Sequence, residues 1–169
     1  GTVVLEPAAQ GAGVTHVIGA TTLGGGRTLN IRPGYLVTSG TAQLTTGATT
    51  MTGDATVNFQ PGSPFVSAAL LTGALTMGGN SLTTTGTGAA TTGAVTLGGN
   101  ITFTVGANAP LTLGALGDGA VARTITKAGA GTMGEVFAAS LPALGAVAVL
   151  AVVGLLVYAV IQHNMACKG

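Results

Sequence analysis

An uninterrupted apolar run near the C-terminus constrains the fold of this chain more than any other feature. From Leu141 to Ile161 the sequence reads LPALGAVAVLAVVGLLVYAVI, without a charged or strongly polar side chain. About 20 apolar helical residues, at ~1.5 Å rise each, match the ~30 Å hydrocarbon core of a bilayer. A water-exposed helix would have a polar face, and this run has none. The sequence predicts a transmembrane helix over residues 140–162, with Ser140 as its N-cap and Pro142 in its first turn.

Small residues recur at every third position of this predicted helix: Gly145, Ala148, Ala151 and Gly154. Small side chains let two helices approach closely in lipid. We expect this face to seat the helix against another copy or a larger partner, and a generic Ala/Gly-rich anchor remains the alternative. The span contains no ionisable side chain, so a transport or proton-relay role is not indicated.

The predicted helix divides the chain into a β domain (1–139), the membrane span (140–162) and a short tail (163–169). Lys168 in the tail favours a cytoplasmic or virion-interior C-terminus. The β domain is then expected on the extracytoplasmic or virion-exterior side. The sequence opens at Gly1 without a leader pattern, so we expect either a signal removed earlier or insertion through the C-terminal helix. Cys167 is the one cysteine and is expected to be a free thiol.

Charged side chains are scarce along the whole chain. They make up 5% of the residues, against roughly 25% in an ordinary soluble protein. The net charge is +1, and the five Lys and Arg residues are scattered, so they cannot neutralise a phosphate backbone. Aromatic residues make up 4%, with no Trp, which removes a stacking platform for single strands. The composition therefore argues against nucleic acid as a partner.

A short phrase recurs in the first two thirds of the chain. Each copy has an apolar residue, a turn of Gly, Asn or Asp, and then an alternating strand such as Ile101–Val105. Glycine adopts positive φ at tight turns without a steric penalty. Alternation of Ile, Phe and Val with Thr places the apolar side chains on one face. The copies begin at Thr22, Thr50, Thr76, Thr96 and, more weakly, Thr112, so the interval between them is irregular and shortens along the chain.

Short strands separated by glycine turns predict an all-β domain. The recurrence favours a stacked, solenoid-like array. A β-sandwich or jelly roll is the alternative, since it would have similar strands without the recurring turn phrase.

One segment resembles a known family. Residues 122–133 read ARTITKAGAGTM, which is similar to the "LTKxGxGTL" phrase of autotransporter-associated β-strand repeats. The match lies within residues 111–133, and the looser similarity in style covers residues 74–133. The resemblance implies a right-handed parallel β-helix exported across a membrane, and it implies no catalytic residues. The chain departs from the family in having one clear copy and a C-terminal apolar run in place of a β-barrel.

Candidates for catalysis or metal binding are few. Triad chemistry needs a base and an orienting acid, and the histidines are only His16, on a predicted strand, and His163, at the membrane edge. The carboxylates Glu6, Asp54, Asp118 and Glu135 are dispersed, and we expect Asp54 and Asp118 to be turn residues. There is no Cys/His cluster for a metal, and no Gly-Lys-Ser/Thr phosphate loop. We therefore expect neither enzymatic activity nor a cofactor or metal.

These observations favour a membrane-anchored structural subunit of a surface or particle assembly, such as a virion coat or spike, or a cell-surface layer. Its expected partners are the lipid bilayer and either itself or a larger membrane complex. Two alternatives remain open: an accessory subunit of such a complex, and a surface adhesin. An adhesin would stack sugars on surface aromatic residues, for which Tyr35, Phe59 and Phe65 are the candidates.

Overall fold

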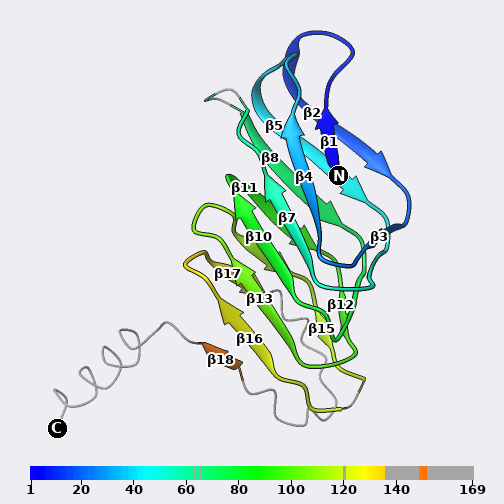
Figure 1. Ribbon diagram of the computed structural model, residues 1–169. Helices are drawn as coiled ribbons and strands as arrows, with labels where there is room; N and C mark the ends of the chain where they lie inside the picture. The colour runs from blue at the N-terminus through cyan, green and yellow to red at the C-terminus, as the bar shows by residue number, and fades with distance from the viewer. Residues whose placement is uncertain (63, 65, 120, 136–148, 152–169) are drawn as a thin grey trace, which may run out of the picture.

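The strands of this chain wind into a parallel β-solenoid of about five turns (Figure 1). The structure is a computed structural model, and it describes residues 1–62, 64, 66–119, 121–135 and 149–151. Every strand pairing among these residues is parallel. The predicted all-β solenoid is therefore confirmed, and the sandwich or jelly roll, which is built from antiparallel strands, is wrong.

Three sheets form the sides of the solenoid. Sheet A contains, in spatial order, β1 (Thr2–Leu5), β4 (Arg27–Pro33), β7 (Ala55–Phe59), β10 (Leu82–Gly86), β13 (Ile101–Val105), β16 (Ile125–Ala128) and β18 (Val149–Ala151). Sheet B contains β2 (Gly11–Ile18), β5 (Val37–Thr46), β8 (Val66–Thr72), β11 (Gly88–Thr92), β14 (Leu111–Leu113) and β17 (Met133–Glu135). Sheet C contains β3 (Thr21–Leu23), β6 (Thr49–Met51), β9 (Leu75–Gly78), β12 (Val95–Leu97) and β15 (Leu116–Gly117).

Each turn runs once through sheets A, B and C. In sheet C, Thr22 pairs with Thr50, Thr50 with Thr76, and Thr76 with Thr96. The recurring phrase therefore marks successive turns, which become shorter along the chain. The fifth predicted position is wrong: Thr96 pairs with Gly117, whereas Thr112 lies in β14 of sheet B. The last and shortest interval in the sequence thus joins strands of two different sheets.

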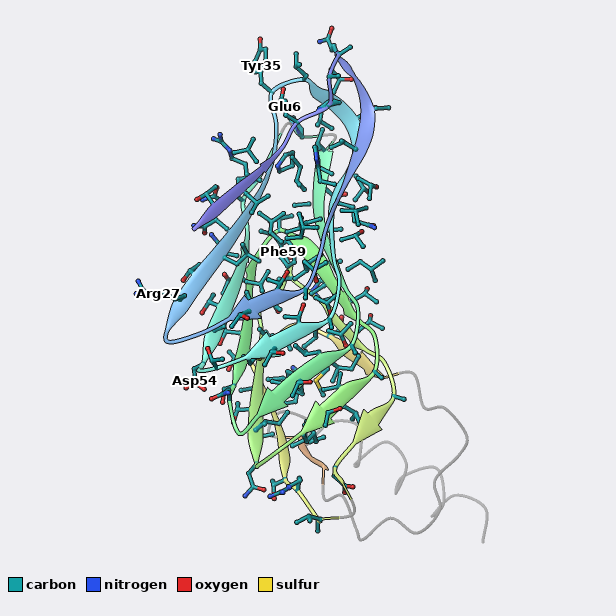
Figure 2. The ribbon with its side chains drawn as sticks, turned by 90° about the vertical axis from the view of Figure 1, so that its right-hand side faces the viewer. Glu6, Arg27, Tyr35, Asp54 and Phe59 are labelled. Carbon is teal, nitrogen blue, oxygen red and sulfur yellow. The ribbon has the colours of Figure 1, made fainter. Side chains whose placement is uncertain are left out.

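Inward-facing side chains of all three sheets fill the interior. Phe59, Phe103, Leu44, Leu111 and Met77 are almost completely buried, as alternation along each strand requires. Phe59 lies inside the solenoid in Figure 2. A Cβ at Gly88 in the next turn would lie 2.5 Å from Phe59 Cγ, so glycine at that position leaves room for the phenyl ring. In this turn a single residue, Thr87, forms the corner between β10 and β11.

The predicted membrane helix lies almost entirely outside the described residues. Within residues 140–162 only 149–151 are described, and they form β18, which pairs with β16. The described part of the chain contains no helix that could cross a bilayer. The helix, and the division of the chain at residue 139, therefore remain predictions from the sequence.

Candidate functional site

The corner from sheet B to sheet C has the same construction in every turn. Each of its five copies is a Gly-Ala pair that lies between the last residue of one strand and the first residue of the next. By contrast, the corner from sheet A to sheet B varies from one residue, Thr87, to six, residues 60–65. Turn length therefore changes mainly elsewhere. In sheet C the outward threonines stay paired from turn to turn, with one register shift after Thr96. The glycines are Gly19, Gly47, Gly73, Gly93 and Gly114, and each is followed by an alanine.

The glycines stack so closely that no side chain fits between turns. A Cβ at Gly73 would lie 3.0 Å from the carbonyl carbon of Gly47, and a Cβ at Gly93 would lie 2.9 Å from that of Gly73. The N–H of Gly93 donates to the carbonyls of Gly73 and Thr72, at 3.1 and 3.0 Å. From Gly19 to Gly93 the corner is thus a continuous hydrogen-bonded column of backbone, whereas the N–H of Gly114 donates to Thr92 Oγ1 (3.4 Å).

Buried threonines support this column from inside. Thr46, Thr72 and Thr92 end their strands at stacked positions of sheet B, each 6% exposed or less. Each Oγ1 donates to the carbonyl of the glycine that follows it, at 3.1 to 3.2 Å. Because a buried hydroxyl needs a partner, these bonds satisfy the threonines and hold the corner in one conformation.

The outer surface of sheet C carries two ranks of small side chains, which we call the Ala/Thr face. In the first four turns the corner alanine and the threonine two residues later point outward, and the residues between them point inward. In the fifth turn Gly117 takes the place of the threonine. All members are exposed except the last alanine, which is half-buried. No charged residue belongs to the face. Its members are Ala20, Ala48, Ala74, Ala94 and Ala115 in one rank and Thr22, Thr50, Thr76 and Thr96 in the other.

Backbone hydrogen bonds of nearly equal length join neighbouring turns along the alanine rank. The N–H that follows each corner alanine donates to the alanine carbonyl of the next turn, as from Thr21 to Ala48 (2.9 Å) and from Leu75 to Ala94 (2.8 Å). None of the four outward threonine hydroxyls bonds to another residue in the described part of the chain. These hydroxyls are therefore directed to solvent or to a partner.

The outer surfaces of the other two sheets differ from this face. On sheet A, side chains bond to one another across the turns: Asn58 Nδ2 donates to Asn30 Oδ1 (2.9 Å), and Thr85 Oγ1 donates to Asn58 Oδ1 (3.0 Å). On sheet B, one stacked rank mixes apolar and polar side chains. Its members are Val17, Thr45, Leu71, Thr91 and Thr112. Sheet A also stacks four threonines whose hydroxyls bond to no other described residue: Thr28, Thr56, Thr83 and Thr104. The last three of these are half-buried, whereas all four threonines of the sheet C rank are exposed.

The carboxylates singled out in the sequence bind backbone of neighbouring turns. Glu6 Oε1 accepts the N–H of Leu36 at 2.6 Å, and Asp54 Oδ1 accepts the N–H of Ser81 at 2.7 Å. Figure 2 shows Glu6 at one end of the solenoid and Asp54 far from it, on the corner between sheets C and A. The predicted turn role of Asp54 is confirmed, with the difference that its partner lies in the next turn. Asp118 follows β15, and Glu135 ends β17.

His16 lies exposed on β2, where its Nε2 is 3.0 Å from the carbonyl oxygen of Glu6. That oxygen only accepts, so the ring nitrogen donates. His163 lies outside the described residues. No group of three His, Cys, Asp or Glu side chains in the described part of the chain is placed to hold a metal ion.

An open pocket of about 530 Å³ lies between the corners of sheets A and B in the first three turns. Arg32 is the charged residue in its lining, and Tyr35, beside it, is 93% exposed. The three aromatic residues considered for an adhesin do not form one platform, because Phe59 is fully buried in the core. Phe65 lies outside the described residues.

The predicted helix contact face is not described as a helix. Gly145, Ala148 and Gly154 lie outside the described residues, and Ala151 ends β18. This face remains a prediction from the sequence.

Sequence patterns missed the Gly-Ala corner, although its signal is present. Each copy of the recurring phrase begins at the outward threonine. The inward residue of the strand lies one position before that threonine, and the corner glycine lies three positions before it, so the phrase includes neither. Extended backward, the segments read IGATTL, TGATTM, TGALTM, TGAVTL and LGALGD, starting at residues 18, 46, 72, 92 and 113. The last segment places the fifth turn correctly.

Comparison with known proteins returned no match: no protein-family model, no curated protein and no solved structure is similar to this chain.

Proposed function

We propose that this chain is a membrane-anchored structural subunit of a surface or particle assembly, such as a virion coat or spike, or a cell-surface layer. In this proposal the apolar span of residues 141–161 anchors the chain, and the solenoid stands outside the membrane. The solenoid presents the Ala/Thr face outward, as a surface open to an extended partner, and no catalytic step is involved.

The Ala/Thr face is the observation that carries this proposal. The later turns are shorter than the first, yet the threonines Thr22, Thr50, Thr76 and Thr96 remain paired across sheet C, so the fold preserves this rank while turn length varies. A catalytic site concentrates different side chains at one point. A surface that repeats the same two side chains suits contact with something extended.

The small-residue face of the anchor supports association of several copies. At about 100° per residue, Ala148 and Ala151 would lie within about 60° of each other on a helix, flanked by Gly145 and Gly154, and close packing of small residues in lipid is favourable. Copies held together in this way would present their solenoids side by side. In the proposal the anchors therefore make the assembly contacts, and the Ala/Thr faces remain accessible.

Native mass of the full chain extracted in mild detergent tests this function. We expect a homomeric particle of several copies. Changing Ala148 and Ala151 to Leu should lower the copy number, because larger side chains hold the helices apart. Changing Val153 and Val160 to Leu, on the opposite side of the helix, is the matched control and should leave the mass unchanged.

Two results would contradict the proposal. A wild-type chain that is monomeric under these conditions is not an assembly subunit. Co-purification at fixed stoichiometry with a larger membrane complex would instead identify an accessory subunit.

A further inference from the structure

The Ala/Thr face is a two-dimensional lattice whose spacings are set by the β-sheet. Neighbouring strands lie ~4.7–4.9 Å apart, so the threonines Thr22, Thr50, Thr76 and Thr96 form a rank with that period. Ranks two residues apart along a strand are separated by about 6.6 Å, at ~3.3 Å per residue. A partner that matches the threonine rank must itself repeat at the first of these intervals.

Crystalline water repeats at nearly the first of these intervals. Water molecules hydrogen-bonded at ~2.75 Å in tetrahedral geometry place second-neighbour oxygens about 4.5 Å apart. The threonine rank agrees with this distance within about a tenth. Each hydroxyl has one donor and two acceptor lone pairs, the same kinds of group that water offers.

Binding to a crystal lattice requires hydroxyl groups at fixed positions, and the threonine side chains meet this requirement. A β-branched side chain has restricted χ1 on a strand, so its hydroxyl keeps one direction. The strands below it are fixed by the glycine column and by the buried threonines that bond to it. The four hydroxyls have no bond to other described residues, so they are free to bond to ordered water.

A second protein copy is a poorer occupant of this face. Five short strands cover roughly 400 Å², so two such faces would bury about 800 Å² in total. Stable protein complexes bury about 1,200–2,000 Å² and rely on aromatic or arginine anchors. The Ala/Thr face has neither the area nor such anchors. Its lack of charge also removes the strong hydration that would hold liquid-like water against an ice front.

We propose that the Ala/Thr face binds ice, with the threonine hydroxyls occupying positions of the crystal lattice and the alanine methyls filling the spaces between. This inference rests on the proposed function only in taking the face as exposed at a surface. The ligand is water in its crystalline form, and the contact involves no covalent step.

Partition into ice tests the assignment with the full chain. Fluorescently labelled chain in lipid nanodiscs is placed around a slowly growing ice hemisphere, and the labelled fraction in the ice is compared with that of empty labelled discs. We expect the wild type to be enriched and to slow the recrystallisation of small ice grains. The double variant Thr50→Lys with Thr76→Lys should lose both effects, because two ammonium groups interrupt the rank.

A matched double variant separates loss of the face from added charge. Thr15→Lys with Thr91→Lys adds the same two charges on exposed positions of sheet B and should keep ice enrichment. If circular dichroism shows that the sheet C double variant does not fold, Thr76→Tyr replaces it, since tyrosine suits a strand and breaks the rank without charge. A foldable face variant that enters ice as well as the wild type does would overturn the proposal.

Enrichment of the wild type no greater than that of empty discs would also overturn it. Native mass of the same samples keeps the two proposals apart. A multi-copy particle that stays out of ice refutes ice binding and leaves the structural role standing. A monomer that enters ice refutes the assembly and leaves ice binding standing.

Discussion

At the scale of single residues, the strictest limit on side-chain size is found where the backbones of neighbouring turns are in contact. The glycines of the corner between sheets B and C do not need positive φ; none of the five is among the glycines that adopt it. From the second turn on they are required because the backbone of the preceding turn occupies the place of a side chain, whereas Gly19 in the first turn has open space there. The position in the stack therefore decides what each glycine tolerates.

Gly73→Ala should destabilise the chain by about 1–3 kcal/mol, the usual cost of forcing a methyl group into filled space. Gly19→Ala at the same position of the first turn is the control, because nothing lies within 4 Å of its added Cβ. That change should be neutral or stabilise by up to about 1 kcal/mol, through lower entropy of the unfolded chain. Urea unfolding of both variants measures the difference. Equal destabilisation would show that the glycines serve local conformation and not close stacking.

At the scale of elements, the corners have unequal tolerance. The corner between β7 and β8 is the longest, whereas the corner between β8 and β9 has only Gly73 and Ala74. Short corners flank sheet C in all the turns from β2 to β12, with two residues before each strand and three after. Sheet C is thus the rigid side of the solenoid, and the side where sheets A and B meet absorbs changes in length.

Insertion of Gly-Ser after Pro61 should cost less than about 1 kcal/mol, because lengthening a surface loop adds little closure entropy. The same insertion after Ala74 should cost more than about 2 kcal/mol, since it separates Leu75 from the Ala94 carbonyl and breaks the column. Chemical denaturation of the two insertion variants provides the comparison. Similar losses at the two sites would contradict the assignment of sheet C as the rigid side.

The strands also show which features of the fold can be predicted from the sequence. Alternation of apolar residues with threonine predicts strands such as β13 and the solenoid itself, because each strand buries one face. The fifth turn is misplaced from sequence because Thr112-Leu113-Gly114 has the same local pattern as a sheet C strand. Pairing across turns assigns it to sheet B, and so does the Gly114-Ala115 pair that follows it, once that pair is recognised as the corner. Local alternation alone does not predict the Ala/Thr face, since it does not tell which sheet a strand joins.

At the scale of the whole molecule, each turn contacts only the turns next to it, as in other repeat proteins. Stability is then a sum over turns and their interfaces. Inner turns have two neighbours and the first turn has one among the described residues. Local opening is therefore expected to begin at the ends of the solenoid.

Hydrogen exchange tests this gradient at two equivalent amides. The N–H of Leu75 and the N–H of Thr21 each donate to the alanine carbonyl of the next turn, at 2.8 and 2.9 Å. We expect exchange at Leu75 to be at least about tenfold slower, a difference of ~1.4 kcal/mol in opening. Equal rates would mean that the solenoid opens as one cooperative unit.

The sequential contact of turns also sets how the chain carries load. A pull applied along the chain from one end would strip strands from a single terminal turn while the remaining turns stayed folded. Each released turn, such as Thr22 to Thr50 or Thr76 to Thr96, would add roughly 65 to 100 Å of contour, at ~3.3–3.6 Å per residue. Such a chain yields stepwise, so an object attached to the solenoid would be held by an extensible tether that dissipates work one turn at a time.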